Sequence, residues 1–246
     1  MSKAINNYLD IIHAKLDDIS SQMHMLEEAA AHITTGIMKG QSIYVFGASH
    51  AGILTEELTY RAGGLALINP IFNPSLLLNV TPITLTSDLE KMPEFGDKII
   101  RSSGIKQDDV LLLHSVSGRN PVVIDAALSA KSMGAMVIAL TSVNTSRQVH
   151  SKHDSGKLLI HVADYVIDNL CDYGDACVSI NGLPQKAAPL STILGATIVN
   201  SLMLRVSERL MESGVTPPIL ASANLEGNEL INQAIFEKFA NQIHYL

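Results

Sequence analysis

The fold of this chain is decided by the stretch VLLLHSVSGRNP, which spans residues 110–121. Its first part is a continuous apolar run that ends at His114, as expected of a strand that is covered on both faces. Its second part is a polar loop that ends in Asn120 and Pro121, a preferred helix N-cap and a preferred first helical residue. The stretch therefore predicts a buried strand, a short loop and the start of a helix.

Strands and helices alternate on both sides of this stretch. Four further apolar runs predict strands at residues 42–46, 65–68, 136–140 and 165–167. Helices are predicted at 53–62 and at 121–133, and residues 158–160 are expected to add an edge piece to the sheet. Such alternation is typical of a doubly wound sheet. We therefore predict an α/β fold of the flavodoxin-like kind, with a five-stranded parallel sheet flanked by helices.

The first forty residues form an amphipathic helical segment. Apolar residues recur at steps of four and three, at Ile5, Leu9, Ile12, Leu16, Ile19, Met23, Leu26, Ala30, Ile33 and Ile37. This pattern predicts one long helix, or two helices in line, with a seam for a partner. The partner is either the chain's own domain or a second copy. We predict a helical segment at 1–40, one domain at 41–246, and a homo-oligomer, either a dimer or a tetramer.

Composition excludes several classes of protein. Of the 246 residues, 47% are hydrophobic and 17% are charged, which argues against disorder. The net charge is -7 and there is no basic cluster, so we expect no nucleic-acid partner. The apolar run at 190–203 is short and interrupted by polar residues, and two cysteines are not a disulfide framework. We expect a cytoplasmic protein that does not bind a membrane.

The loop after residue 114 has the chemistry of an anion site. Ser115 and Ser117 supply hydroxyl groups, and Gly118 lets the backbone approach a ligand closely. The helix that begins after Asn120 presents free N–H groups at its positive end. These donors suit a phosphate; the alternative is a serine-rich cap that binds only water.

A second loop, GASH at residues 47–50, has the same position after a strand and before a helix. It lacks the spacing of a dinucleotide fingerprint, so we predict no nicotinamide or flavin cofactor, and indeed no cofactor. Ser49 is a candidate ligand for the phosphate or for a sugar hydroxyl. His50 is a candidate for proton transfer near neutral pH, unless it is simply a surface loop residue.

Together the two loops resemble the signature of the SIS (sugar isomerase) domain. In that family a strand, Gly-x-Ser and a helix are followed by a later strand that ends in Ser-x-Ser-Gly-x-x. This sequence has Gly47-Ala48-Ser49 and then SVSGRN at 115–120. Asn120 stands where the family usually has Thr, and it too can donate and cap a helix. The resemblance covers roughly residues 35–210 and is strongest toward single-domain phosphosugar isomerases of undefined substrate.

The resemblance also implies residues for catalysis and for sugar binding. Residues 57–61, ELTYR, are similar to the Glu-Leu-x-x-Arg of phosphoheptose isomerases, in which the Glu is a proposed base. This implies Glu57 as the base, with Glu56 as a rival because the spacing from Ser49 is two residues shorter. In the family a Ser-Thr pair opens a long helix at the edge of the sugar site. Ser191 and Thr192 match that pair, although both are equally consistent with plain helix capping.

The favoured function is aldose–ketose isomerisation of a sugar phosphate by general acid/base chemistry. Glu57 would be the base and His50 its partner, with Gly47 beside the sugar. A non-catalytic sugar-phosphate sensor and a sugar-phosphate lyase or etherase are the alternatives. His150 and His153 are three residues apart, but their polar surroundings indicate a solvated loop, and we predict no metal site. Both histidines remain weak candidates for proton transfer.

Overall fold

A computed structural model describes residues 2–246 of the chain. Its main sheet has five parallel strands in the order β2-β1-β3-β4-β5. The strands are β1 (Ile43–Gly47), β2 (Ile68–Pro70), β3 (Val110–His114), β4 (Met136–Thr141) and β5 (Tyr165–Asp168). This is the flavodoxin-like order, so the predicted five-stranded parallel sheet is confirmed.

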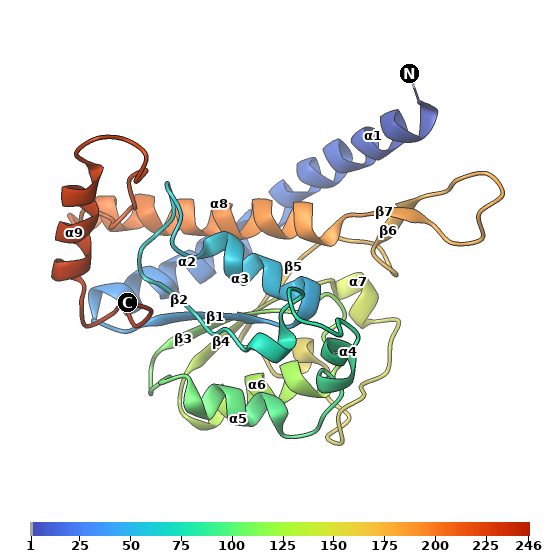
Figure 1. The fold of residues 1–246 in the computed structure, drawn as a ribbon, viewed down its shortest axis with the longest axis horizontal. Coiled ribbons are helices and arrows are strands. Elements are labelled where there is room, and N and C mark those ends of the chain that lie inside the picture. Colours follow the sequence, from blue (N-terminus) through green and yellow to red (C-terminus); the bar gives the residue numbers. More distant parts are fainter. Residues whose placement is uncertain (1) are drawn as a thin grey trace.

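Helices cover both faces of this sheet (Figure 1). One face packs against α2 (Met23–Met38), α3 (Ile53–Leu58) and α8 (Ser191–Glu212); the other packs against α5 (Phe95–Ser102) and α6 (Pro121–Ser132). Successive residues of a strand point to opposite faces, so Leu112 joins the first core while Leu111 and Leu113 join the second. Burial on both faces explains why β3 is an unbroken apolar run.

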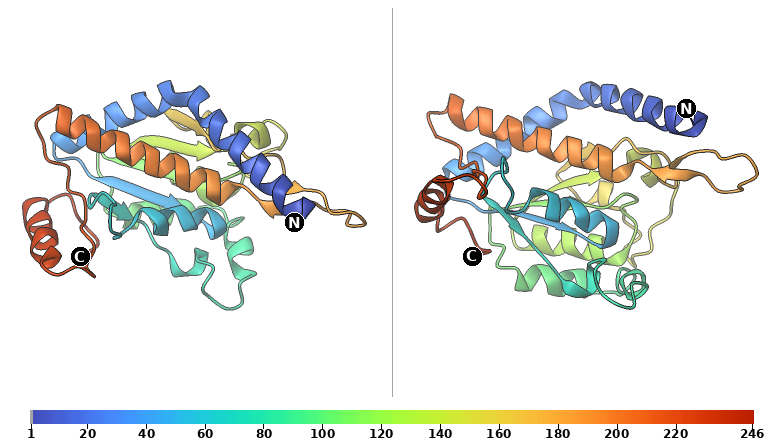
Figure 2. Two further views of the ribbon diagram at one scale, coloured as in Figure 1. Left: turned by 90° about the horizontal axis from the view of Figure 1, so that it is seen from above. Right: turned by 45° about the horizontal axis from the view of Figure 1, so that its top comes forward.

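The N-terminal segment is long and helical, as predicted. It consists of α1 (Lys3–Asp18), a 3-10 turn η1 (Ile19–Gln22) and α2. The second half of the apolar stripe, including Leu26 and Ile33, is buried on the chain's own sheet and on α8. In the first half Ile5 and Leu9 are exposed, whereas Ile12 and Leu16 are half-buried against a small core that includes Leu194. Figure 2 shows α1 running past the start of α8. Pairing with a second copy stays a prediction.

The expected edge piece at 158–160 is wrong, because these residues form a 3-10 turn, η4 (Leu159–His161). The N–H of Leu159 donates to the carbonyl of Gly118 at 2.8 Å instead of pairing with a strand. The turn therefore supports the loop after β3, and β5 is the edge strand on that side of the sheet. A two-stranded antiparallel hairpin, β6 (Ala176–Val178) and β7 (Ala187–Pro189), was not predicted.

The remaining elements are short. They are η2 (Ser49–Gly52), η3 (Pro74–Leu76), α4 (Leu85–Leu89), α7 (Val143–Ser146) and α9 (Asn228–Lys238). Within residues 2–246, none of the helices combines the length and the apolar character needed to cross a bilayer.

Candidate functional site

The two predicted loops lie side by side at the switch point of the sheet. Strand order reverses between β1 and β3, so the chain leaves the carboxyl ends of these strands toward opposite faces. Gly47 and His114 end the two strands and are register partners. The loops at 48–52 and at 115–120 therefore follow adjacent strand ends at the switch point, which is where open α/β sheets bind ligands.

The loop after β1 is a tight turn that needs glycine at its start. A Cβ atom on Gly47 would lie 2.5 Å from the carbonyl oxygen of Ala51, closer than any real Cβ contact. Ser49 has a φ of 52°, in the left-handed region that costs energy for a residue with a side chain. Strained backbone of this kind concentrates at functional sites, and here the Ser49 hydroxyl donates to the carboxylate of Glu90, which follows α4.

The loop after β3 is folded back on itself. The Ser115 hydroxyl accepts a hydrogen bond from the N–H of Gly118 at 3.2 Å, and Gly118 has a φ of 59°. A Cβ on Gly118 would lie 2.9 Å from the Cβ of Leu159, so the η4 turn closes over this glycine. Ser115 is thus engaged within its own loop. The half-buried Ser117 hydroxyl makes no hydrogen bond within residues 2–246.

Asn120 occupies the N-cap position of α6, as predicted, but its side chain does not cap the helix. Its Nδ2 donates instead to a carboxylate oxygen of Glu90 at 2.6 Å. The Ser49 hydroxyl donates to the other oxygen of the same carboxylate. The N–H of Val122, in the first turn of α6, donates to the Glu90 main-chain carbonyl at 3.2 Å. Both loops and the amino end of α6 therefore converge on one residue.

Glu90 was not predicted from the sequence. It follows α4 in the irregular stretch between β2 and α5, and it lies 41 residues from Ser49 and 30 from Asn120. No local motif surrounds it, and the contact arises only because the α4 segment folds across the carboxyl ends of β1 and β3. A charged residue in an otherwise irregular stretch was the only signal available.

His114, at the end of β3, bonds the loop that follows β1. Its Nδ1 lies 3.0 Å from the carbonyl oxygen of Ala51, so Nδ1 must carry the proton. Burial lowers the pKa of this imidazole to about 4, and it is therefore neutral at pH 7. Its Nε2 is consequently an acceptor, buried and without a partner among the described residues.

The two candidate catalytic groups lie apart from this cluster. The Glu57 carboxylate, on α3, is paired with Arg61 and accepts from Nδ2 of Asn200 on α8 at 2.9 Å. His50 is exposed on η2, and Glu56 is exposed on α3. Neither Glu57 nor His50 is hydrogen-bonded to the loop at 115–120 in the part of the chain that the structure describes. The structure thus places Glu57 between α3 and α8.

Ser191 and Thr192 open α8, near the carboxyl end of β5. The Asp175 carboxylate accepts from the N–H of Ser191 and from its hydroxyl, both at 2.7 Å, and so fixes the start of the helix. Nδ2 of Asn169, which follows β5, donates to the Ser191 carbonyl at 3.0 Å. Ser191 is buried in these contacts, whereas Thr192 is half-buried in the first turn.

Of His150 and His153, which follow α7, His153 makes structural hydrogen bonds. His153 bridges Asp125 of α6 at 2.9 Å and Ser155 at 2.7 Å, and His150 is exposed. Across residues 2–246, no three His, Cys, Asp or Glu side chains are grouped so that they could hold a metal ion. Cys171 and Cys177 are buried free thiols, and burial raises both pKa values, that of Cys171 to about 12.

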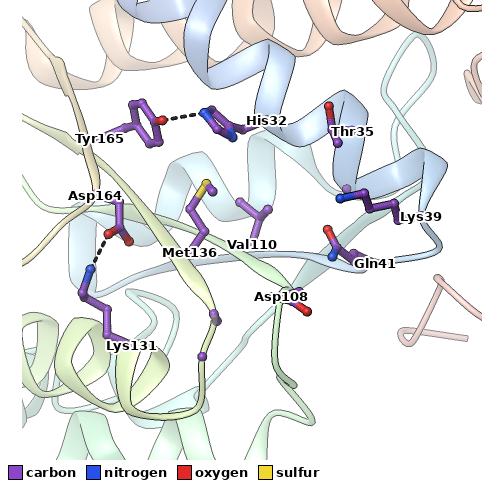
Figure 3. Close-up of a pocket in the computed structure, with 13 residues that line it drawn as sticks. His32, Thr35, Lys39, Gln41, Asp108, Val110, Lys131, Met136, Asp164 and Tyr165 are labelled. Atoms are coloured by element: carbon purple, nitrogen blue, oxygen red, sulfur yellow. Dashed lines mark hydrogen bonds and ion pairs between the residues drawn. The ribbon is translucent and has the colours of Figure 1, made fainter.

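A separate hollow of about 680 Å³ lies at the opposite edge of the sheet, by the first residues of β3, β4 and β5 (Figure 3). Four of its polar side chains are paired with each other: His32 bonds the Tyr165 hydroxyl, and Lys131 forms an ion pair with Asp164. The hydrogen-bond donors that meet at Glu90 lie at the carboxyl ends of the strands and not in this hollow.

The fold and the two loops define a sugar-isomerase type of domain, and the comparison with known families agrees. A model described as SIS domain matches residues 7–142, and the chain belongs to this family. A UPF0309 protein of Shouchella clausii is 48% identical over 246 residues, covering 100% of both chains. Another from Oceanobacillus iheyensis is 50% identical over 240 residues, or 97% of each chain.

Solved structures share the fold at low identity. A phosphoheptose isomerase from Francisella tularensis is 18% identical with a TM-score of 0.55, covering 85% of this chain and 100% of that one. The phosphoheptose isomerase of Neisseria gonorrhoeae is 14% identical with a TM-score of 0.56, covering 83% and 97%. The Vibrio vulnificus NanR protein, solved with ManNAc-6P, is 18% identical with a TM-score of 0.50, covering 94% and 69%.

Proposed function

We propose that this protein binds a phosphorylated sugar between the loops that follow β1 and β3. One observation carries the proposal: Ser49, Asn120 and the amino end of α6 all donate to a single acidic residue, Glu90. Ser49 and Asn120 already hold the carboxylate of Glu90 between them, and donors arranged in this way beside a helix N-terminus are suited to a phosphate ester. Membership of the SIS family supports the same ligand class, as do neighbours named as phosphoheptose isomerase or solved with ManNAc-6P.

In this proposal the phosphate contacts come from both loops. Ser49, Ser117 and Asn120 donate from side chains, while Ser115 shapes the turn and Gly118 keeps the backbone close to the ligand. The sugar extends away from the phosphate past Gly47 and toward the start of α8, where Thr192 and Ser191 lie.

The proposed reaction is aldose–ketose isomerisation through an enediol, with Glu57 as the base and His50 as its partner. Glu57 follows Ser49 by eight positions, through the turn η2 and into α3, so it lies roughly 14 Å further along at about 2 Å per residue in the 3-10 turn and about 1.5 Å in the α-helix. A sugar chain that runs from the phosphate along α3 would therefore approach Glu57. The carboxylate must then exchange its bonds to Arg61 and Asn200 for the substrate.

Replacing Glu57 by Gln tests this reaction. We expect Glu57→Gln to abolish incorporation of solvent deuterium into the sugar phosphate that gives the largest thermal shift, while the shift itself persists. A base contributes about 100-fold or more to such a rate. The matched control is Glu56→Gln, an exposed neighbour on the same helix, which should exchange at the wild-type rate. Unchanged exchange in Glu57→Gln would contradict the assigned base.

A sugar-phosphate sensor is the second candidate. It is favoured by the placement of Glu57 and His50, neither of which is bonded to the phosphate loop at 115–120 in the described chain. A sensor would bind the ligand with a thermal shift but would exchange no deuterium. Measuring both quantities on one preparation of the wild-type protein therefore separates the two functions.

A further inference from the structure

Glu90 occupies the place that the proposed ligand needs. Its two carboxylate oxygens accept from Ser49 and Asn120, one from each loop, and its carbonyl covers the N–H of Val122. A carboxylate only accepts hydrogen bonds, so the Asn120 amide must turn its Nδ2 toward it. The Oδ1 of Asn120 is left buried without a partner among the described residues.

These contacts give the unliganded site an anion of its own. A phosphate group requires the same hydroxyl, amide and main-chain donors, and two negative groups cannot share them without strong repulsion. We propose that the Glu90 carboxylate is a resident anion that closes the cradle in the absence of ligand and that the phosphate of a sugar ester displaces it. This inference rests on the proposed phosphate site, and in it Glu90 regulates access to that site.

The segment that carries Glu90 is built to move a short way. Around α4, at 82–91, most side chains are exposed, and the ion pair of Asp88 with Lys91 is a loose surface contact at 3.7 Å. Beyond it, α5 is fixed closely to α6, because a Cβ on Gly96 would lie 1.9 Å from the Val122 carbonyl oxygen. Displacement is therefore confined to the α4 segment, and the unsatisfied Oδ1 of Asn120 makes the closed arrangement easier to leave.

A resident carboxylate also sets specificity. A ligand must offer at least as much negative charge and as many acceptors as the group it replaces. A phosphate dianion exceeds the Glu90 carboxylate in both charge and acceptors, whereas a sugar carboxylate only equals it and a neutral sugar carries no charge. Glu90 therefore acts as a specificity-determining residue that favours a phosphate ester over ligands with less negative charge.

The decisive variant is Glu90→Gln, which keeps the size and an acceptor oxygen but removes the charge. Its control is Asp88→Asn, which removes the same charge from the same segment at a side chain that is 77% exposed. Inorganic phosphate is the probe, titrated by calorimetry. We expect Glu90→Gln to bind phosphate at least about fivefold more tightly than wild type, the factor for unit charges about 4 Å apart even in water. Asp88→Asn should bind as wild type does.

Hydrogen exchange supplies the second readout. Phosphate should slow amide exchange at 115–122 in the wild-type protein and accelerate it at 82–91, because the α4 segment is released. In unliganded Glu90→Gln, the segment 82–91 should already exchange faster than in Asp88→Asn. Slower exchange of 82–91 on binding, or weaker phosphate binding by Glu90→Gln, would overturn the displacement. Phosphate binding by none of the three proteins would instead contradict the proposed function itself.

Discussion

His114 makes the stability of this protein depend on pH at the residue scale. Burial holds the pKa of its imidazole at about 4 in the folded chain, against about 6.5 when unfolded. The unfolded chain therefore binds the proton more tightly than the folded chain does. As a result, the free energy of unfolding is highest above about pH 6.5 and decreases as pH falls toward 4. The shift corresponds to about 3 kcal/mol in the free energy of unfolding.

The test compares wild type with His114→Asn by urea unfolding between pH 7.5 and 4.5. The Asn amide keeps a donor for the Ala51 carbonyl but has no proton to gain, so it isolates the titration. We expect the free energy of unfolding of wild type to fall by about 2–3 kcal/mol more than that of the variant over this range. Parallel pH profiles would show that His114 is protonated in the folded chain as readily as in the unfolded one.

At the scale of elements, the closest packing joins the helices α5 and α6. A Cβ at Gly96 would meet the backbone of α6 at the Val122 oxygen and, at 2.8 Å, at the Ala126 nitrogen. We expect Gly96→Ala to lower the free energy of unfolding by about 3 kcal/mol, because backbone atoms cannot move aside as a side chain can. Lys98→Ala, on the exposed face of α5, should change it by less than about 0.5 kcal/mol. Equal values for the two variants in urea unfolding would contradict this packing.

Elements were predictable where the signal is local. The start of α6 could be predicted because Asn120 and Pro121 are strong capping signals on either side of the boundary. The turn η4 could not be predicted, because the apolar residues 158–160 have the pattern of a strand. Only the hydrogen bond from Leu159 to Gly118, which joins distant segments, favours a turn. Glu90 was missed for the same reason. Its role depends on a contact between segments that are far apart in the sequence.

At the scale of the whole molecule, the repeating pattern of strand and helix was sufficient to predict both the sheet and the edge that carries the site. Parallel strands place all their carboxyl ends together, so the loops at 47–50 and 115–120 had to be neighbours once β1 and β3 were adjacent. What the pattern could not place was Glu57, since a helix position alone does not determine which neighbouring helix its carboxylate meets. The contact with Asn200 depends on how α8 crosses α3.

At the opposite end of the sheet, near the starts of β1 and β2, the last residues of the chain pack against the strands. Asn69 is buried beside β1, and its Nδ2 donates to the carbonyls of Ile43 and Gln242 at 3.1 and 2.9 Å. Its Oδ1 accepts from the N–H of His244 at 2.7 Å. The side chain of Gln242 in turn donates to the carbonyl of Gln41 at 2.8 Å. One amide thus joins the β1 and β2 edge of the sheet to the last residues of the chain.

Removing this amide should cost stability without touching the site. We expect Asn69→Ala to lower the free energy of unfolding by about 3 kcal/mol, because buried main-chain groups lose their partners. Asn232→Ala is the matched control, since that amide bonds only Ala221 on a half-buried surface and should cost about 1 kcal/mol. Phosphate affinity, measured by calorimetry below the unfolding temperature, should be the same in both variants and in wild type. Weaker phosphate binding by Asn69→Ala alone would mean that the two edges of the sheet are coupled.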